Sequence, residues 1–472
     1  MSLIVSISGV RGVVGETLTP EVAVLYAKSF AEYCLQKTPQ GTKCKIVLGR
    51  DGRITGKILT NIISSTLLAM GCDVVAIGVC PTPTVALAVE KSDAIGGIAV
   101  TASHNPMQWN GMKFFNHEGL FLDAKEMKDF LEVVNSGYMN YAAWNKIGTH
   151  ISDTFWIQKH IDTVLQLKCI DVEKIKSRKF KVVLDCINSA GGVIVPPLLK
   201  MLECEVVEMN CDVSGIFAHT PEPIPENLTA LAQKVRDENA DLGIAVDPDV
   251  DRLVLITEKG EPLGEEYTIA SVVNFVLSRE QRAKSPADGG INSEQSVVVN
   301  LSTTRAVDEI AKSYNAEVVR TPVGEINVAK KMKEVGAIIG GEGSGGVIYP
   351  EAHYGRDAIV GIGLVLQMLA EFGRSLSEYK ATLPQYYITK SKVEIGNLNP
   401  DKLLNQIIEK FKDEKINTED GVKIDFADSW VHLRKSNTEP IVRIIAEATN
   451  VMEAEQSVKH FKEEILKLSK EH

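Results

Sequence analysis

Three short apolar stretches decide the fold of this chain: KIVLG at 45–49, KVVLD at 181–185 and SVVVN at 296–300. Each is followed by a second apolar stretch, and helix-periodic sequence such as ILTNIISSTLLAMG lies between the two. Continuous runs of this kind, separated by helices, are typical of buried parallel strands in α/β units. The second stretches are CDVVAIG at 72–78, CEVVEMN at 204–210 and AEVVRTP at 316–322. The sequence therefore predicts three divergent copies of one α/β unit.

The third strand of each copy ends in an unusual polar or glycine-rich loop. These loops are TASHNP at 101–106, DPDVDR at 247–252 and GEGSGG at 341–346. In open parallel sheets, ligands bind beyond the carboxyl ends of the strands. We therefore expect the three loops, which differ in chemistry, to face one cleft.

The copies also set the expected domain boundaries. We expect α/β domains over 1–150, 151–255 and 256–378, with the polar stretch 278–295 as a surface loop inside the third. From 379 to 472 an alternating pattern typical of antiparallel strands precedes an amphipathic helix. The predicted fold is three related α/β domains with mixed, mainly parallel sheets plus a smaller C-terminal α+β domain, around a central cleft.

The composition is that of a globular chain with an acidic surplus. Among 472 residues, Lys and Arg number 51 and Asp and Glu number 62, so the formal net charge is −11. A hydrophobic fraction of 44% excludes a disordered or low-complexity protein. The negative charge argues against nucleic acid or an anionic membrane as the main partner. It leaves room for an anionic small substrate at a locally basic site.

The eight cysteines predict a reducing compartment. They form no C-x-x-C pair, and most lie in apolar, strand-like stretches where a buried free thiol is the ordinary state. The opening stretch is too short for a signal-peptide core, and no apolar run approaches the roughly 20 residues of a membrane span. We expect a cytoplasmic protein without a membrane partner.

The loop DPDVDR is a candidate metal site. Asp247, Asp249 and Asp251 alternate along the chain, and in an extended segment their carboxylates would share one face. Three like charges this close are costly without a cation, and oxygen ligands suit Mg²⁺. An EF-hand is excluded because Arg252 stands where that loop needs glycine. A solvated acidic turn remains the alternative.

Ser103 in TASHNP is a candidate nucleophile. Its neighbour His104 suggests a Ser–His hydrolase, but the chain has no G-x-S-x-G elbow, and adjacency in sequence does not make a catalytic pair. A phosphoserine beside a magnesium site is a more specific hypothesis, since its oxygens could complete the metal's ligands. Serine before an Asn-Pro turn is also an ordinary turn residue.

Two further loops are candidates for substrate binding. GEGSGG formally satisfies G-x-G-x-x-G, but Pro350 argues against the helix that a dinucleotide site needs, and Glu342 would repel a pyrophosphate. A carboxylate and a hydroxyl suit sugar hydroxyls better, although a plain glycine turn is possible. RKSNT at 434–438, with Arg443, combines cations with hydroxyl and amide donors. That combination suits a phosphate, and a solvated basic strand end is the alternative.

Together, TASHNP, DPDVDR, GEGSGG and RKSNTEP resemble the active-serine, metal, sugar and phosphate loops of the α-D-phosphohexomutase family. The resemblance runs in the family's order over essentially the whole chain. It implies a phosphoryl group carried on Ser103 and Mg²⁺ as cofactor. The implied catalytic residues are Ser103, Arg11, His104 and Lys113; the metal ligands are Ser103, Asp247, Asp249 and Asp251; the substrate-binding residues are Arg252, Glu342, Ser344, Arg434, Ser436, Asn437, Thr438 and Arg443.

The resemblance also implies a reaction. A phosphoryl group would move between O6 and O1 of a hexose phosphate, through a hexose 1,6-bisphosphate that serves as intermediate and activator. RTPVGEINVA from Arg320 resembles phosphoglucosamine mutase-like members, so glucosamine 6-phosphate is the expected substrate. A phosphomannomutase/phosphoglucomutase is the alternative. A metal-dependent sugar phosphatase and a non-enzymatic sugar-phosphate-binding protein stay open as other classes.

Overall fold

The computed structural model describes residues 2–137, 139–283, 295–396, 398–436 and 440–470. The chain folds as two compact units, one made of residues 1–268 and 344–380 and the other of residues 269–343 and 381–472. Each unit is described by itself. Among the described residues, no helix is long and apolar enough to cross a membrane.

Each of the three predicted repeats forms a sheet whose first strand is central. The first strands are β3 (Lys45–Arg50), β8 (Lys181–Asp185) and β12 (Ser296–Asn300). The second strands, on one side, are β4 (Asp73–Val79), β9 (Glu205–Met209) and β13 (Glu317–Thr321). The third strands, on the other side, are β5 (Gly96–Val100), β10 (Leu242–Val246) and β14 (Ile339–Glu342). All these pairs are parallel, so each motif-bearing strand holds the same place in its sheet.

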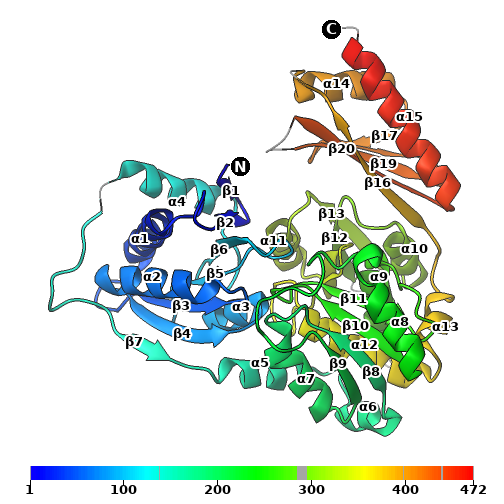
Figure 1. Cartoon of the computed structure of the whole chain (residues 1–472). Coiled ribbons are helices and arrows are strands. Elements are labelled where there is room, and N and C mark those ends of the chain that lie inside the picture. The colour runs from blue at the N-terminus through cyan, green and yellow to red at the C-terminus, as the bar shows by residue number, and fades with distance from the viewer. Residues whose placement is uncertain (1, 138, 284–294, 397, 437–439, 471–472) are drawn as a thin grey trace, which may run out of the picture. The chain divides into compact units, whose positions relative to one another are not determined.

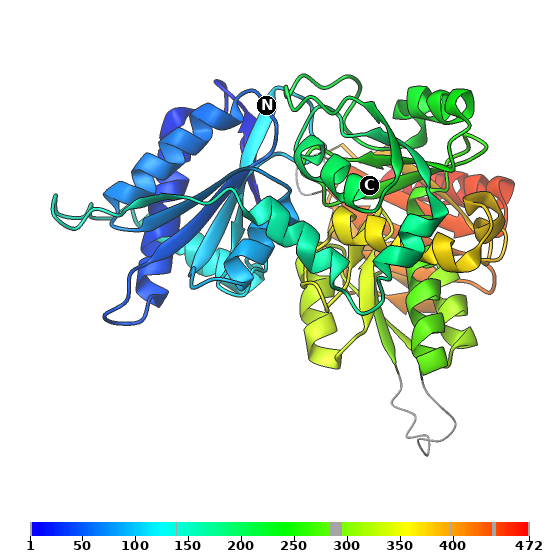
Figure 2. The same cartoon turned by 90° about the horizontal axis from the view of Figure 1, so that it is seen from below.

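The first α/β domain extends this plan into a seven-stranded mixed sheet in the order β1-β2-β6-β5-β3-β4-β7. Its helices cover both faces of the sheet (Figures 1 and 2). Thr19-Pro20 marks the start of α1: the Thr19 hydroxyl accepts the backbone N–H of Val22, and Pro20 is the first residue of the helix. The remaining elements are β1 (Ile4–Ser6), β2 (Gly9–Val13), α1 (Pro20–Lys37), α2 (Gly56–Ala69), α3 (Thr82–Glu90), β6 (Trp109–Phe115), α4 (Ala124–Ser136) and β7 (His150–Ser152).

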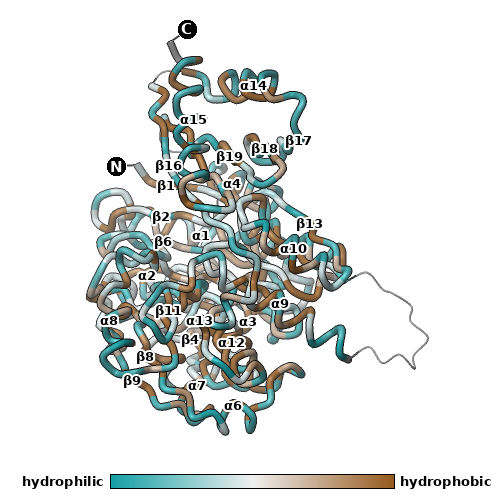
Figure 3. The backbone as a smooth tube through the Cα atoms, turned by 90° about the vertical axis from the view of Figure 1, so that its right-hand side faces the viewer, coloured by the Kyte–Doolittle hydropathy of each residue, from teal (hydrophilic) through white to brown (hydrophobic). Residues whose placement is uncertain are grey.

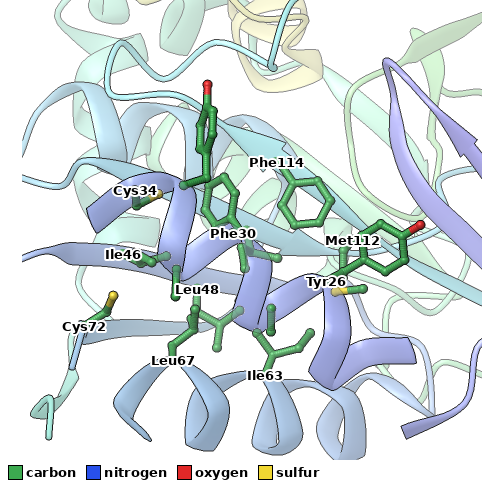
Figure 4. Packing of buried hydrophobic residues seen from close by; sticks show 14 of the residues in the cluster. Tyr26, Phe30, Cys34, Ile46, Leu48, Ile63, Leu67, Cys72, Met112 and Phe114 are labelled. Atoms are coloured by element: carbon green, nitrogen blue, oxygen red, sulfur yellow. The ribbon is translucent and has the colours of Figure 1, made fainter. Parts of the chain in front are cut away.

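The core of this domain lies between the sheet and the helices α1, α2 and α4. Phe30 of α1 packs with Ile46 and Leu48 of β3 and with Ile63 and Leu67 of α2, and all five are fully buried (Figure 4). Ile46 and Leu48 share this face because side chains alternate along a strand. Burying each such side chain contributes roughly 1.5–3 kcal/mol. The domain therefore holds its loops on a well-packed support.

The rest of the first unit is the second repeat with the segment after the glycine-rich loop. The sheet of this repeat runs β11-β10-β8-β9, with β11 antiparallel to β10. Helix α12 packs against α5 and α6 in the same unit. The elements are α5 (Trp156–Leu165), α6 (Val172–Arg178), α7 (Gly191–Met201), η1 (Pro225–Asn227), α8 (Thr229–Glu238), β11 (Leu253–Thr257), β15 (Gly346–Ile348), α12 (Ala358–Phe372) and α13 (Leu376–Lys380).

The second unit contains the strands of the third repeat and the C-terminal α+β domain. The C-terminal sheet is antiparallel in the order β16-β20-β19-β18-β17, as the alternating pattern predicted. Helix α14 carries brown and teal residues (Figure 3) and buries its apolar ones. The elements are α10 (Ala306–Ser313), α11 (Glu325–Val335), β16 (Tyr387–Glu394), α14 (Pro400–Lys410), β17 (Lys415–Asn417), β18 (Val422–Asp425), β19 (Trp430–Lys435), β20 (Ile441–Ala448) and α15 (Val451–Lys470).

One local prediction is wrong. The stretch 278–295 was expected to be a loop, but α9 (Glu265–Ala283) continues through its first six residues. Ser278–Ala283 contains the good helix formers Arg, Glu and Gln and no proline or glycine, so nothing in it ends a helix already begun. Residues 284–294 of the predicted loop lie outside the described residues.

Candidate active site

Ser103 follows the end of β5 in a tight, buried turn. Its backbone has φ 48°, a left-handed conformation that is uncommon for residues other than glycine, and the residue is 6% exposed. The hydroxyl Oγ lies 3.1 Å from Oδ2 of Asp247, to which it donates, and 3.3 Å from Nδ1 of His104. The turn thus presents the hydroxyl to the acidic loop rather than to solvent.

A closed ring of hydrogen bonds holds the Ser103 turn in place. The Ser103 N–H donates to Thr101 Oγ1 at 2.9 Å, and that hydroxyl donates to Asp51 Oδ2 at 2.7 Å. The same carboxylate oxygen accepts Arg53 Nε at 3.0 Å, and Arg53 Nη2 returns to the Ser103 carbonyl at 2.6 Å. The backbone of Ser103 is therefore held at its N–H by Thr101 and at its carbonyl by Arg53 of the β3–α2 loop.

Arg53 is the centre of this ring, and its side chain is fully buried. Besides its two bonds within the ring, its guanidinium donates to the carbonyls of Asn105, Pro106 and Trp109 at 2.7–2.9 Å. All five N–H donors of the guanidinium are thus used. The sequence contained a signal for it, GRDGR at 49–53, which by itself could not be told from a turn with a salt bridge.

The acidic loop is a turn, not the extended segment that the spacing predicted. Val250 has φ 62°, and Asp247 Oδ1 accepts the backbone N–H of Asp251 at 3.1 Å, so the chain reverses between β10 and β11. The reversal is required because these neighbouring strands run antiparallel. The three aspartates, including Asp249, are fully buried, and one oxygen from each lies within 4.8 Å of the others. Convergence comes from the curl of the turn rather than from alternation.

Two cations partly neutralise the three carboxylates. Lys113 Nζ on β6 lies 2.7 Å from Asp249 Oδ2 and 3.2 Å from Asp251 Oδ2, and Arg356 Nη2 lies 2.6 Å from the same Asp251 oxygen. The other oxygens, Asp249 Oδ1 and Asp251 Oδ1, are buried and have no hydrogen-bond partner among the described residues. Orphaned buried carboxylate oxygens are costly and suit a hard divalent cation. The donor set therefore fits a magnesium-like ion, and the cluster could bind a metal.

Burial and neighbouring charges shift the pKa values of this cluster in opposite directions. Burial raises the pKa of Asp247 well above its usual value, and repulsion from Asp251 raises it further. Burial alone would raise the pKa of Asp251, but Arg356 and the other nearby cations hold it below its usual range. Burial would lower the pKa of Lys113, yet the two aspartates that it contacts raise it. Lys113 is accordingly an ammonium ion at neutral pH.

The other residues assigned to this loop region lie around it. Arg11 on β2 donates from Nη1 to Asn105 Oδ1 at 3.1 Å, which places it against the serine turn. Arg252 Nε is 3.8 Å from Asp251 Oδ1. Burial, followed by the charge of Arg252, lowers the pKa of His104 to about 2, so its imidazole is neutral and a weak base. This does not favour the Ser–His hydrolase interpretation.

A second cluster of possible metal ligands in the same unit has a different character. His160 Nε2 and His353 Nε2 lie 2.7 and 2.9 Å from Asp357 Oδ2. The other ring nitrogens are engaged by the Thr84 hydroxyl and the Gly355 N–H, and Asp357 Oδ1 caps α12. Every ligand atom is satisfied by the protein, so this cluster is a buried structural junction.

In the second unit, Glu342 ends β14 and is 5% exposed. Its Oε1 accepts Asn300 Nδ2 at 2.8 Å and the Gly324 N–H at 3.0 Å. The glycine-rich loop contains no helix, as expected, because a turn follows β14 directly. Ser344 lies half-buried in that turn and belongs to the first unit.

The basic residues of the C-terminal domain lie on two neighbouring strands. Arg434 of β19 is directly opposite Arg443 of β20, which is exposed. Arg434 Nη2 contacts Asp420 Oδ2 at 2.9 Å, while its Nε is buried and has no hydrogen-bond partner among the described residues. Ser436 is half-buried, and Asn437 and Thr438 lie outside the described residues.

Comparison with known proteins agrees with this architecture. Models of the phosphoglucomutase/phosphomannomutase family match the chain as α/β/α domain I over 3–139, domain II over 158–260, domain III over 274–387 and the C-terminal domain over 392–464. A phosphoglucomutase/phosphomannomutase of Thermococcus kodakarensis is 38% identical, over 95% of both chains.

A relative and a solved structure extend the comparison. A protein of Methanopyrus kandleri named "Probable phosphoglucosamine mutase" is 33% identical, over 97% of this chain and 96% of its own. A crystal structure of a phosphoglucomutase/phosphomannomutase family protein from Burkholderia thailandensis has a TM-score of 0.84 and 26% identity, covering 99% of this chain and 98% of that one. The chain therefore belongs to the phosphoglucomutase/phosphomannomutase family and is a phosphohexomutase, an isomerase of the intramolecular phosphotransferase type.

Proposed function

We propose that Ser103 carries the transferring phosphoryl group and that the chain moves it between O6 and O1 of a hexose phosphate. The observation that carries this proposal is the position of Ser103 Oγ, buried and 3.1 Å from a carboxylate oxygen of the acidic turn. A serine held by an internal ring of hydrogen bonds is oriented before substrate arrives, which lowers the cost of reaching the transition state.

The proposed reaction has two balanced transfers. In the first, the bond between phosphorus and Ser103 Oγ breaks, a bond forms to a free hydroxyl of the hexose phosphate, and the hydroxyl proton leaves to a base. The product is a hexose 1,6-bisphosphate. In the second, the other phosphoryl group returns to Ser103 Oγ, and the departing sugar oxygen takes up a proton. Lys113 and Arg11 would offset negative charge on the transferring oxygens.

We assign the metal site to Asp247, Asp249, Asp251 and Ser103. The orphaned Oδ1 atoms of Asp249 and Asp251 are the supporting observation. Mg²⁺ bound there would supply positive charge to phosphoryl oxygens. Lys113 and Arg356 occupy the opposite oxygens of the aspartates and so orient the set toward such an ion.

We assign substrate recognition to the remaining candidates. Glu342 and Ser344 would bind sugar hydroxyls, and Arg252 would also bind substrate. The phosphate would be bound by Arg434, Ser436, Asn437, Thr438 and Arg443. The facing arginines Arg434 and Arg443 and the unpartnered Nε of Arg434 support the phosphate role. The four domains proposed for these tasks are 1–150, 151–255, 256–378 and 379–472.

For the sugar, we propose glucosamine 6-phosphate, converted to glucosamine 1-phosphate. The 33%-identical relative is named for phosphoglucosamine. A phosphomannomutase/phosphoglucomutase activity is the second candidate, because the 38%-identical relative carries that name. Ratios of kcat/KM on the 6-phosphates of glucosamine, mannose, glucose and N-acetylglucosamine decide between them, with the best substrate exceeding the others by about tenfold, or 1.4 kcal/mol.

Ser103→Ala tests the phosphoserine. The wild-type protein is expected to gain the mass of one phosphoryl group when incubated with hexose 1,6-bisphosphate, and Ser103→Ala to gain none and to lose isomerisation. Ser29→Ala, which alters another buried serine, inside α1, serves as the control. Release of inorganic phosphate without isomerised product would instead indicate a sugar phosphatase. Unchanged isomerisation by Ser103→Ala would refute the proposed carrier.

We also propose a cytoplasmic location. All eight cysteines are free thiols in the structure, six of them buried. Free thiols in this number are typical of a reducing compartment.

A further inference from the structure

Asp420 of the C-terminal domain is a junction between the two candidate recognition groups of the second unit. Its Oδ2 is 2.9 Å from Arg434 Nη2 and accepts the Val323 N–H, also at 2.9 Å. Val323 precedes Gly324, whose N–H donates to Glu342 Oε1. One carboxylate thus joins the arginine assigned to phosphate with the backbone that holds the carboxylate assigned to sugar hydroxyls.

Gly324 lies at the start of α11, where the first route reaches Glu342. Its φ of 128° is a conformation that residues with a Cβ rarely adopt. The consecutive N–H groups of Val323 and Gly324 donate to Asp420 and Glu342, respectively. The two carboxylates are therefore linked through one residue, Val323.

A second, independent route reaches the same junction. Asn300 donates to Glu342 Oε1, and its own Oδ1 accepts the Ser302 N–H at 2.9 Å. Ser302 Oγ is 2.9 Å from Nδ1 of the fully buried His432, whose Nε2 donates to the Asp420 carbonyl at 2.6 Å. Because a carbonyl can only accept, Nε2 carries the proton and Nδ1 of the neutral ring accepts from Ser302.

These two routes close into one loop between Glu342 and Asp420, and Asp420 in turn contacts Arg434. His432 and Arg434 project from the same strand, β19, two residues apart, so they point to the same face of the sheet. A closed hydrogen-bonded loop resists displacement more than separate pairs, since no member can move alone. The position of Arg434 is therefore tied to that of Glu342.

We propose that Asp420 and the Ser302–His432 pair are positioning residues that hold Arg434 in a fixed position relative to Glu342. The groups assigned to phosphate and to sugar hydroxyls are then both in place before substrate binds. The inference rests on the proposed roles of Arg434 and Glu342. Because binding energy is then not used to order the arginine, hexose phosphate binds more tightly and more selectively over inorganic phosphate. No contact between Asp420 and the substrate is required.

Asp420→Ala is the main test, with steady-state kinetics and calorimetric binding of glucosamine 6-phosphate as readouts. We expect KM and Kd to rise about tenfold while kcat changes less than about threefold, equivalent to about 1.4 kcal/mol of lost binding. Asp420→Asn keeps an oxygen acceptor for Val323 and Arg434 and is expected to restore most of the affinity. Asp401→Ala is the matched control, because Asp401 pairs with Lys435, the exposed neighbour of Arg434.

A double-mutant cycle separates positioning from general loss of structure. If Asp420 acts through Arg434, the Kd of the double variant Asp420→Ala/Arg434→Met exceeds that of Arg434→Met by less than about twofold. A Kd of the double variant that rises by the product of the two single increases would overturn the inference. So would tighter binding by Asp420→Ala, which would mean that the Asp420 charge repels the substrate. Ser302→Ala is expected to raise Kd in the same direction by about threefold, and an unchanged Kd would remove the second route.

The outcome is distinguishable from failure of the proposed function. If the wild-type protein binds glucosamine 6-phosphate but does not isomerise it, the proposed reaction fails and the binding cycle still tests Asp420. If Arg434→Met alone leaves binding of glucosamine 6-phosphate and of inorganic phosphate unchanged, both the phosphate assignment and the positioning inference fail.

Discussion

Replacing Arg53 by methionine probes how the serine turn is held. Methionine retains apolar volume but removes all five guanidinium donors and the positive charge beside Asp51. Four carbonyl oxygens, from residues 103, 105, 106 and 109, lose their arginine donors. The Asp51 carboxylate keeps the Thr101 hydroxyl and the Arg53 backbone N–H as partners but loses its cation.

The expected magnitude follows from these losses. A buried acceptor left without a donor costs about 1–3 kcal/mol, and breaking a buried ion pair costs about 3–5 kcal/mol. These costs do not add, since the loop can relax and Asp51, whose pKa burial already raises, can take up a proton. We expect a loss of about 4 kcal/mol in the free energy of unfolding, a large part of a typical 5–15 kcal/mol.

The effect on catalysis is expected to be larger than the effect on binding. A displacement of Ser103 Oγ by about 1 Å lowers kcat roughly 100-fold. Arg53→Lys keeps the charge but offers only three donors, so it should fall between the wild-type protein and Arg53→Met in both stability and kcat. Urea denaturation and isomerisation rates measure the two quantities.

Two controls make this prediction refutable. Arg236→Met removes an arginine that also donates to a carbonyl, that of Gly260, but lies on α8 and should cost less than about 1 kcal/mol. Asp51→Asn combined with Arg53→Met should be less destabilised than the sum of the single changes by about 2 kcal/mol, because no buried charge remains unpaired. A cost below 1 kcal/mol for Arg53→Met with unchanged kcat, or strict additivity, would refute the reasoning.

Two further predictions concern the metal and pH. Asp249→Asn is expected to weaken Mg²⁺ binding, measured by calorimetry, at least 100-fold, or about 2.7 kcal/mol. Asp185→Asn, which alters a buried aspartate at the end of β8, should leave Mg²⁺ binding unchanged, and equal affinities in the two variants would contradict the proposed site. Burial lowers the pKa of His432 from 6.5 to about 4. As pH falls, His432 therefore binds a proton in the unfolded chain before it does so in the folded one. The free energy of unfolding consequently decreases by about 3 kcal/mol between pH 6.5 and pH 4. His432→Gln should lack this component in urea denaturation, and identical pH profiles would show the reasoning to be wrong.

The strands were predictable because their signal is local. Between their first and last residues, runs such as KVVLD and SVVVN are entirely apolar, and this alone indicates burial on both faces of a sheet. The C-terminal alternation and the start of α1 at Thr19-Pro20 are equally local. The one boundary that failed, at Ser278–Ala283, failed because polar residues on a helix and in a loop look alike without knowledge of what precedes them.

The candidate site was predictable only in its reactive groups. Ser103 and the three aspartates could be named because short motifs concentrate unusual chemistry. The sequence gives no measure of how the acidic loop curls, and the extended segment it suggested is a turn. Arg356 carried no signal at all, since its partner Asp251 lies 105 residues earlier in the chain.

What the sequence by itself determined is the repeated α/β plan and the chemistry placed at the end of each third strand. Only the tertiary structure decided which distant residues contact that chemistry. These contacts are the bonds of Arg53, 50 residues from Ser103, to the serine turn, the ion pairs of Lys113 and Arg356 with the aspartates, and the Asp420 junction. The physical reason is that hydrophobic periodicity is written residue by residue, whereas a hydrogen bond or ion pair exists only once the strands that carry its partners have been packed together.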